Sequence, residues 1–488
     1  MSSSIHQLTP QAIWQNFYRL NQIPRASKKE EKIRQFMIDF GSNLGLEVVT
    51  DEVGNVLIKK PASPGMETRK TVVLQGHLDM VHQKNNDTVF DFDSQGIDMY
   101  IDGDWVKAKG TTLGADNGLG VAAIMGILSS SDIVHPALEA LFTIDEETGM
   151  TGALGLKPGF LSGEILLNLD TEEDDELDIG CAGGIDVTAS KNYSEIPCPP
   201  NHIGVEITVN GLKGGHSGMD IHKGLGNSNK IMNRILFAIC PSVGIMLSKV
   251  DGGSLRNAIP RESKAILSLQ PELMASFEAE FTRIKTDILT EFKNLEPSLN
   301  IQFKTCEAPQ KAMDPIEETQ VLKSIYGAIN GVYRMSPEMA DLVEASNNVA
   351  KVTIGDGCAT VLCLTRSSVE STKMEVANTL KSVFELGGFD CQFSGGYPGW
   401  KPEPNSSIVQ LMTQRYQQLF GTPPAVIACH AGLECGIIGS HYPNMEMISF
   451  GPTIKGAHSP DERANISSSV KFWNLLLDTL KHIPERAS

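Results

Sequence analysis

The chain has 488 residues, 41% of them hydrophobic, so it can bury a large core and is long enough for two or three domains. Lys and Arg total 41 against 59 Asp and Glu, and the formal charge of -18 repels nucleic acid phosphates and anionic membranes. No basic segment leads into an apolar one at the N-terminus, and no apolar run approaches the ~20 residues that cross a bilayer. We therefore expect a soluble cytoplasmic protein with neither nucleic acid nor membrane as a partner.

The nine cysteines are scattered along the chain and never form a Cys-x-x-Cys pair, which favours reduced thiols in a cytoplasm. A thiolate zinc site at Cys429 and Cys435 is the competing interpretation, although their spacing matches no common ligand pattern. We expect these two residues to pack as small apolar side chains instead.

The first part of the chain is expected to alternate strands with helices. The capping-box pattern Ser27-Lys-Lys-Glu30 predicts the start of a helix, which continues through Phe40 at helical spacing. Strands at 46–49 and 56–58 are expected around a turn that contains Gly54. The other predicted elements are buried strands at 72–75, 138–144 and 165–169 and a helix at 118–128. This alternation predicts an α/β fold with a mostly parallel sheet flanked by helices.

A second domain is expected to begin near residue 187. Val205, Ile207 and Val209 alternate with polar residues, which predicts a half-exposed antiparallel strand. Helices predicted at 226–237 and 273–289 make this segment an inserted α+β domain. The expected division is a catalytic domain of residues 1–186 and 396–488, with a helix at 407–420 and a strand at 445–450, and an inserted domain of residues 187–395.

Residue types that bind metals follow several of the predicted strands. They are His77 after the strand 72–75, Glu146 and Glu147 after 138–144, Asp170 after 165–169, and His458 after 445–450. Asp116 precedes the helix at 118–128. Each residue alone has a plainer explanation as an ordinary hydrogen-bonded side chain. Because function collects at the carboxyl ends of strands in open parallel sheets, their joint placement predicts a metal site.

Imidazole nitrogens combined with carboxylate oxygens suit Zn²⁺, Mn²⁺ or Co²⁺ better than Mg²⁺ or Ca²⁺. Two ions roughly 3.5 to 4 Å apart need a bridging carboxylate, and each ion then needs its own histidine and acidic residue. The expected arrangement has Asp116 as the bridge, His77 and Asp170 on one ion, and Glu147 and His458 on the other. We therefore expect two zinc ions per chain, for which cobalt or manganese can substitute.

Two carboxylates beside these ligands are expected to have other roles. Asp79 is placed to hydrogen-bond the far nitrogen of His77 and fix its tautomer. Glu146 is adjacent to the ligand Glu147, and a carboxylate beside a metal site can act as a general base that accepts a proton from water. The alternative is that the run from Asp145 to Glu147 is a solvated acidic turn.

Further motifs accompany these seven residues along nearly the whole chain. They are Val53-Gly54-Asn55, the runs 84–88, 111–118, 180–185 and 256–260, Tyr397-Pro-Gly-Trp400 and His430-Ala-Gly-Leu-Glu-Cys435. Together they resemble the di-zinc metallopeptidases that include glutamate-releasing carboxypeptidase, succinyl-diaminopimelate desuccinylase, acylases and carnosinase. The resemblance implies a phosphorylase/hydrolase-like catalytic domain with an inserted lid domain, the same ligands and base, and a cis peptide between Asp116 and Asn117.

The resemblance also implies functional residues in the lid. His216, in Gly214-Gly-His-Ser-Gly218, resembles the lid histidine that polarises the scissile carbonyl and stabilises the oxyanion. Asn257 and Arg366 are implied to hold the free carboxylate of the substrate, which suits the planar guanidinium group of arginine. For His216, a structural residue in a glycine-rich turn is the alternative. His430 is expected near the metal site without binding metal.

By this resemblance the chain is expected to hydrolyse short peptides with a free carboxyl end, above all dipeptides, with Xaa-His such as carnosine among the candidates. Glu146 would accept the proton of the attacking water and pass it to the leaving amine. The alternatives are an acylase or desuccinylase on the same fold and a binding protein without catalysis. Pairing of family members through the lid implies a homodimer, in which His216 serves its own site or that of the partner.

Overall fold

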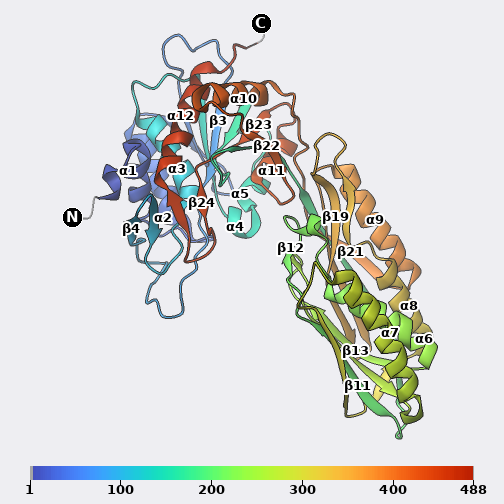
Figure 1. Ribbon diagram of the computed structural model, residues 1–488. Coiled ribbons are helices and arrows are strands. Elements are labelled where there is room, and N and C mark those ends of the chain that lie inside the picture. Colours follow the sequence, from blue (N-terminus) through green and yellow to red (C-terminus); the bar gives the residue numbers. More distant parts are fainter. Residues whose placement is uncertain (1–3, 487–488) are drawn as a thin grey trace. The chain divides into compact units, whose positions relative to one another are not determined.

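The computed structural model describes residues 4–486, and their contacts divide into two compact units (Figure 1). Unit 1 holds the chain up to Gly180, Trp400–Ala428 and the chain from Leu433 onward, whereas unit 2 holds Cys181–Gly399 and Cys429–Gly432. The boundaries expected after residues 186 and 395 lie a few residues from these positions. The short segment Cys429–Gly432, expected in the catalytic domain, belongs to unit 2.

Unit 1 is built on an eight-stranded sheet. Its strands, in spatial order, are β1 (Glu47–Thr50), β2 (Val56–Lys60), β6 (Leu138–Thr143), β3 (Val72–His77), β7 (Ile165–Asn168), β23 (Glu446–Ser449), β8 (Glu176–Cys181) and β22 (Ala425–Cys429). The central strands β6, β3, β7 and β23 pair in parallel, whereas β1 with β2, β2 with β6 and β23 with β8 pair antiparallel. The parallel centre brings the carboxyl ends of four strands to one edge.

Helices flank this sheet, as the sequence predicts (Figure 1). They are η1 (Ile5–Gln7), α1 (Gln11–Leu20), α2 (Glu31–Asn43), α3 (Ala115–Ser129), α4 (Glu146–Gly149), α5 (Thr151–Gly155), α10 (Ser407–Phe420), α11 (Glu434–His441) and α12 (Ile466–His482). A small second sheet has the order β24 (Ile454–Lys455), β25 (Arg463–Asn465), β5 (Trp105–Ala108) and β4 (Met99–Asp102). Helix α3 is apolar on all sides because it packs between α1 and β3.

The start of α2 differs from the predicted capping box. The helix begins at Glu31, and no side chain caps its first turn. Ser27 instead donates from Oγ to Oδ2 of Asp79 at 2.8 Å, and Glu30 Oε1 accepts from the backbone N–H of Lys28 and Asp145 at 2.8 and 3.1 Å. The prediction of a cap was wrong because Ser27 binds the loop after β3, and Glu30 binds the backbone of its own turn and of the loop after β6.

Unit 2 is a nine-stranded sheet with helices on one face (Figure 1). The sheet order is β16 (Asn300–Cys306), β11 (Ile203–Asn210), β15 (Ser263–Leu269), β13 (Met246–Gly253), β19 (Val343–Gly355), β20 (Cys358–Ser367), β9 (Gly183–Asn192) and β21 (Asp390–Tyr397), with β18 (Gly331–Met335) paired to β19. The helices are α6 (Ser228–Val243), α7 (Met274–Phe292), α8 (Pro315–Gly327) and α9 (Glu370–Leu386), with the short turns η2 (Ile221–Lys223) and η3 (Pro271–Leu273). Two small ribbons pair β10 (Glu195–Pro197) with β17 (Lys311–Met313) and β12 (Gly215–His216) with β14 (Ala258–Ile259).

Unit 2 contains the same β-α-β-β-α-β motif twice. One copy runs β11, α6, β13, β15, α7, β16, and the other runs β9, α8, β19, β20, α9, β21. In both copies the fourth strand lies beside the first, then come the third and the second. The second strands of the two copies, β13 and β19, pair antiparallel and join them into one sheet. The first copy is inserted after β9 of the second.

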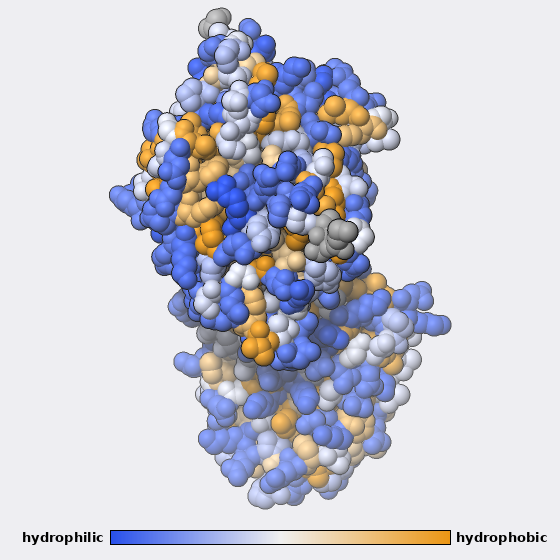
Figure 2. Space-filling view, turned by 90° about the vertical axis from the view of Figure 1, so that its left-hand side faces the viewer, coloured by the Kyte–Doolittle hydropathy of each residue, from blue (hydrophilic) through white to orange (hydrophobic). Residues whose placement is uncertain are grey.

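The face shown in Figure 2 is mainly hydrophilic, and its hydrophobic residues form small separate groups. Within residues 4–486, no helix is both long and apolar enough to cross a membrane.

Candidate metal centre

The ends of the parallel strands bring the predicted site residues of unit 1 together. β3 ends at His77, and β6 is followed by Asp145, whose φ of +53° turns the chain into the short helix that begins with Glu146. β7 is followed by Asp170 and β23 by the loop that carries His458. Since these four strands lie side by side, their carboxyl ends supply adjacent side chains.

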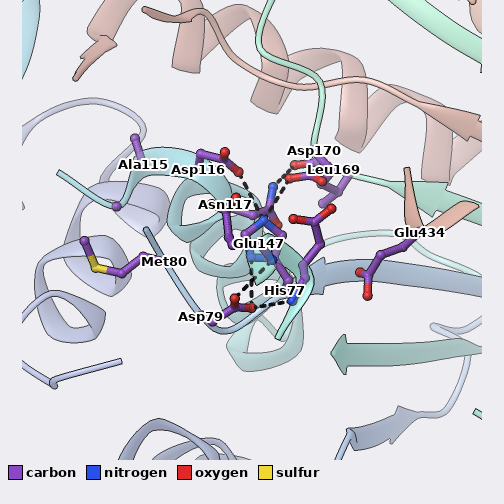
Figure 3. A network of polar contacts seen from close by, with 12 residues as sticks. His77, Asp79, Met80, Ala115, Asp116, Asn117, Glu147, Leu169, Asp170 and Glu434 are labelled. Atoms are coloured by element: carbon purple, nitrogen blue, oxygen red, sulfur yellow. Dashed lines mark hydrogen bonds and ion pairs between the residues drawn. The ribbon is translucent and has the colours of Figure 1, made fainter. Parts of the chain in front are cut away.

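The carboxylate of Asp116 lies between two histidines (Figure 3 shows its position beside His77). Its Oδ1 lies 3.1 Å from Nε2 of His77, which is itself 3.4 Å from Oδ1 of Asp170. Its Oδ2 lies 3.1 Å from Nε2 of His458, which is 3.0 Å from Oε2 of Glu147. Two sets of potential ligand atoms, each within 4.8 Å of one another, therefore share Asp116.

Two of these ligand-type atoms are buried without a hydrogen-bond partner. They are Oε1 of Glu147 and Oδ1 of Asp170. Burying polar atoms without partners is unfavourable, so such atoms in a cluster need another ligand. Nitrogen and carboxylate oxygen donors in this arrangement fit divalent ions such as Zn²⁺. In the described part of the chain, the clusters of this type contain no cysteine, so the thiolate site at Cys429 and Cys435 gains no support.

Electrostatics within the cluster couple its members strongly. Burial alone would raise the pKa of Asp116, but the contacts with His458 and His77 lower it below its usual range. The contacts with Asp116 and Glu147 raise the pKa of His458 to about 11. The excess of carboxylates around two imidazoles makes the site a strong attractor of cations.

Asp79 lies behind His77, on the side away from Asp116 (Figure 3). Its Oδ1 is 3.4 Å from Nδ1 of His77, and its two oxygens accept the backbone N–H groups of Glu146 and Glu147 at 3.1 and 3.3 Å. Asp79 is fully buried. It therefore connects the histidine loop to the turn that carries the acidic pair, beyond the orienting contact predicted for it.

Glu146 forms a cluster with His77 and Glu147. Burial raises the pKa of Glu146 well above its usual value, and the charges of Asp170 and Glu434 act in the same direction. A buried carboxyl group whose pKa is raised suits a general base and acid. This environment disfavours the alternative of a fully solvated acidic turn.

The backbone around Asp116 has the cis peptide to Asn117 that the resemblance implied. The side-chain amide of Asn117 donates to the carbonyl of Leu169 at 2.5 Å, which connects this loop to the end of β7. Gly76 leaves room for Asn117, because a Cβ at residue 76 would lie 2.3 Å from its Oδ1.

Two buried charged residues of the site, Arg25 and Glu462, were not among the residues singled out from the sequence, and a third, Glu434, lies in the quoted motif 430–435 but was given no role there. Glu434 accepts hydrogen bonds from Nε2 of Gln75 at 2.7 Å and Oγ1 of Thr143 at 2.6 Å, near the ends of β3 and β6. Figure 3 places it beside the cluster. No spacing in the sequence distinguishes Arg25 from a surface charge, whereas Glu434 lies in the motif 430–435 and Glu462 lies four residues after the predicted ligand His458.

In unit 2, the structure groups the predicted substrate-binding residues around Ser217. The N–H of Ser217 donates to the carbonyl of Asn257 at 2.8 Å, and Nε of Arg366 lies 3.5 Å from its Oγ. Arg366 is buried and also donates to the hydroxyl of Tyr397 at 2.9 Å. Asn257 is exposed.

The tautomer of His216 follows from its contacts. Its Nδ1 accepts the backbone N–H groups of Gly218 and Met219 at 3.2 and 3.1 Å, so in the neutral ring the proton is on Nε2. Burial lowers the pKa of His216, and Arg366 lowers it further. The ring therefore presents an N–H donor near neutral pH.

His430 belongs to unit 2 with His216 and Arg366. Its Nε2 is 2.7 Å from Oγ of Ser346, and burial together with the charge of Arg366 lowers its pKa to about 3. Within unit 2, His430 therefore lies beside Ser346 and near Arg366.

Histidines and carboxylates gathered around a shared carboxylate, at the carboxyl edge of a parallel sheet, are typical of metal-dependent hydrolases. The chain indeed belongs to the peptidase family M20/M25/M40, whose match covers residues 73–482. This confirms the family resemblance and the fold class expected from the sequence.

Among similar proteins, the cytosol non-specific dipeptidase of Escherichia coli (strain K12) is 42% identical over 484 residues, 99% of this chain and 100% of that protein. The crystal structure of aminoacylhistidine dipeptidase from Vibrio alginolyticus has a TM-score of 0.94 and 44% identity, and covers 99% of both chains. Aminopeptidase PepT from Bacillus cereus shares the fold, with a TM-score of 0.56 at 14% identity over 98% of this chain and 99% of that one.

Proposed function

We propose that this chain is a metal-dependent dipeptidase that hydrolyses unblocked dipeptides. The observation that carries the proposal is the position of Asp116, with one carboxylate oxygen 3.1 Å from His77 and the other 3.1 Å from His458. Two relatives, a cytosol non-specific dipeptidase and an aminoacylhistidine dipeptidase, are 42% and 44% identical over nearly the whole chain and support the same reaction.

The residues proposed to hold the metal are His77 and Asp170 for one ion, Glu147 and His458 for the other, and Asp116 for both. We propose zinc, with cobalt or manganese as substitutes, because the donors are imidazole and carboxylate groups. When bound, two such ions would polarise the peptide carbonyl and make water a stronger acid.

The chain's own residues would move the protons. Glu146 would accept a proton from the attacking water and return it to the amine that leaves when the C–N bond breaks. Its buried position supports this role, since burial raises its pKa well above the ordinary value. Asp79 would keep His77 and the Glu146–Glu147 turn in place through the contacts described above.

Residues of unit 2 would recognise the substrate. His216 would donate from Nε2–H to the carbonyl oxygen as negative charge develops there, a role supported by the two backbone N–H groups that occupy its Nδ1. Arg366 and Asn257 would bind the free carboxylate of the dipeptide. This role is supported by Ser217, which contacts both Arg366 and Asn257 and so holds them near each other.

For the substrate, we propose dipeptides with broad specificity that include Xaa-His sequences such as carnosine. This proposed specificity follows from the two relatives, one of which is a non-specific dipeptidase and the other an aminoacylhistidine dipeptidase. A second candidate, an N-acyl-amino-acid deacylase on the same fold, has no observation in its favour beyond the shared family.

The test is hydrolysis of a substrate panel by the purified chain loaded in turn with zinc, manganese or cobalt. We expect cleavage of free dipeptides, loss of activity with a chelator, and recovery when metal is restored. The matched controls are the same dipeptides with an N-acetyl group and the corresponding N-acetyl amino acids. Preferential hydrolysis of the acetylated amino acids would favour the deacylase, and hydrolysis that persists after complete removal of metal would contradict both.

We further propose that the protein acts in the cytoplasm, because the E. coli relative is named a cytosol dipeptidase. We also propose that it forms a homodimer. Unit 2 already joins two β-α-β-β-α-β motifs within one chain, so we propose that His216 serves the site of its own chain. Light scattering tests the dimer. If His216 instead acts in trans, mixtures of His216→Ala and Glu146→Ala chains should regain activity.

A further inference from the structure

The loop that leads into Asp116 binds a buried carboxylate with its backbone. The Oε2 atom of Glu462 accepts the N–H groups of Leu113 and Gly114 at 2.7 and 3.0 Å, and Oε1 accepts those of Ala115 and Asp116 at 2.7 and 3.3 Å. Glu462 is only 3% exposed. One side chain thus satisfies four consecutive backbone donors, and the last donor belongs to the proposed bridging residue itself.

A buried guanidinium holds the carbonyl side of the same loop. Arg25 donates from Nη2 to the carbonyl of Gly114 at 2.5 Å, and from Nη1 to the carbonyls of Leu78 and Asp79 at 3.2 and 3.0 Å. Its side chain is also nearly fully buried. The loop before Asp116 is therefore bonded through its N–H groups to Glu462 and through a carbonyl to Arg25, which also contacts the loop after His77.

The position of Glu462 in the chain connects two proposed ligands. It lies four residues after His458, so its hydrogen bonds join the loop of His458 to the loop of Asp116. The backbone of Asp116 and Asn117 is not helical, although it lies within α3. Helical hydrogen bonding does not fix the direction of the Asp116 side chain, so contacts from outside the helix must do so.

We infer that Glu462 is a positioning residue that orients Asp116 so that its two oxygens face His77 and His458 at the same time. The inference rests on the proposed two-metal function and adds a condition to it. Because Asp116 belongs to both proposed ion sites, loss of Glu462 should weaken the binding of both ions. Loss of a ligand such as His458 should weaken the binding of only one ion. Substitution of a residue that orients a metal ligand without binding the metal commonly lowers metal affinity 10- to 100-fold.

Glu462→Gln tests this inference, because an amide has one acceptor oxygen and turns its NH₂ group toward the remaining backbone donors. The matched control is Glu139→Gln. Glu139 is also 3% exposed and accepts the N–H groups of Ser162 and Gly163, each at 2.9 Å, but it lies near the start of β6. At 3.3 Å per residue, that is about 13 Å along the strand from Thr143, the partner of His77.

The full-length chain is stripped of metal and titrated with Zn²⁺ against a competing chromogenic chelator, and the thermal midpoint of the metal-free chain is measured in parallel. We expect Glu462→Gln to weaken the binding of both ions about 10- to 100-fold. Glu139→Gln should bind both ions like the unmodified chain, and its single amide oxygen can still accept the N–H groups of Ser162 and Gly163 because both donate to the same oxygen of Glu139.

The inference is wrong if Glu462→Gln binds two ions with unchanged affinity, or if the substitution lowers the affinity for only one ion. Should Glu462→Gln fail to fold, Glu462→Asp retains the charge on a shorter side chain and must show the same weakening of both ions. The unmodified chain separates the two ideas. If it binds fewer than two ions, the proposed function fails, whereas two ions that Glu462 variants leave undisturbed refute only the positioning role.

Discussion

His77 and His458 approach opposite oxygens of one carboxylate, that of Asp116, each at 3.1 Å. The two histidines come from opposite ends of the chain, one at the end of β3 and one in the loop after β23. A single carboxylate between two imidazoles offers each potential ion one oxygen, which is the geometry that a bridging ligand requires.

The bridging role proposed for Asp116 predicts that Asp116→Asn damages metal binding more than His458→Ala does. The amide has only one oxygen that can bind metal, so the side chain can no longer offer one oxygen to each of two ions. We expect Asp116→Asn to retain less than one ion per chain after desalting, and His458→Ala to retain about one. Elemental analysis by plasma mass spectrometry measures both. Two ions retained in Asp116→Asn would contradict the bridge.

Glu146→Gln should separate catalysis from metal binding. The substitution preserves the shape of the side chain but removes the group that accepts a proton, so kcat should fall about 10²- to 10⁴-fold while metal content stays normal. Glu147→Gln is the neighbouring control, because Glu147 contacts His458 at 3.0 Å and its loss should release metal. The assignment of Glu146 as the base fails if Glu146→Gln keeps the turnover of the unmodified chain.

The convergence of His77, Glu147, Asp170 and His458 was predictable because each follows a strand of a parallel sheet, and the carboxyl ends of such strands meet at one edge. Arg25 and Glu462 were not predictable in this way. Their partners are backbone groups, and a sequence pattern does not reveal that a charged side chain is buried against backbone donors or acceptors.

Elements with a strong local pattern were also predictable, such as α10, whose bounds Ser407–Phe420 match the expected helix. The capping box at Ser27 failed because a contact with Asp79, distant in sequence, replaced the local one. The duplication in unit 2 escaped inspection because one motif interrupts the other after β9, so the two copies do not follow each other along the chain.

His216→Ala should lower kcat without changing metal content. Backbone N–H groups occupy Nδ1 of His216, so its Nε2–H is the available donor, and loss of an oxyanion donor costs about 10²- to 10³-fold in kcat. The exposed His222 lies nearby in sequence, and His222→Ala is the matched control that should leave kcat unchanged. Stopped assays with a dipeptide at saturating concentration measure the effect. A normal kcat in His216→Ala would exclude the oxyanion role.

Glu318, in α8 of unit 2, should make stability depend on pH. The side chain is 5% exposed, burial raises its pKa to about 7, and its Oε2 accepts the N–H of Leu247 at 2.7 Å. Because the folded state holds the proton more tightly than the unfolded state, this group stabilises the fold below about pH 4.5. That contribution decreases as pH rises and is lost above about pH 7.

Glu318→Gln removes this loss because an amide stays neutral and its oxygen can still accept the N–H of Leu247. At about 1.4 kcal/mol per pH unit, the variant should gain up to about 3 kcal/mol over the unmodified chain at pH 8, and nearly nothing at pH 4.5. Thermal unfolding followed by circular dichroism at both pH values, with the exposed Glu272→Gln as control, measures the difference. An equal change in the midpoint at both pH values would show that the substitution acts through packing, because only a titrating carboxyl produces a gain that grows with pH.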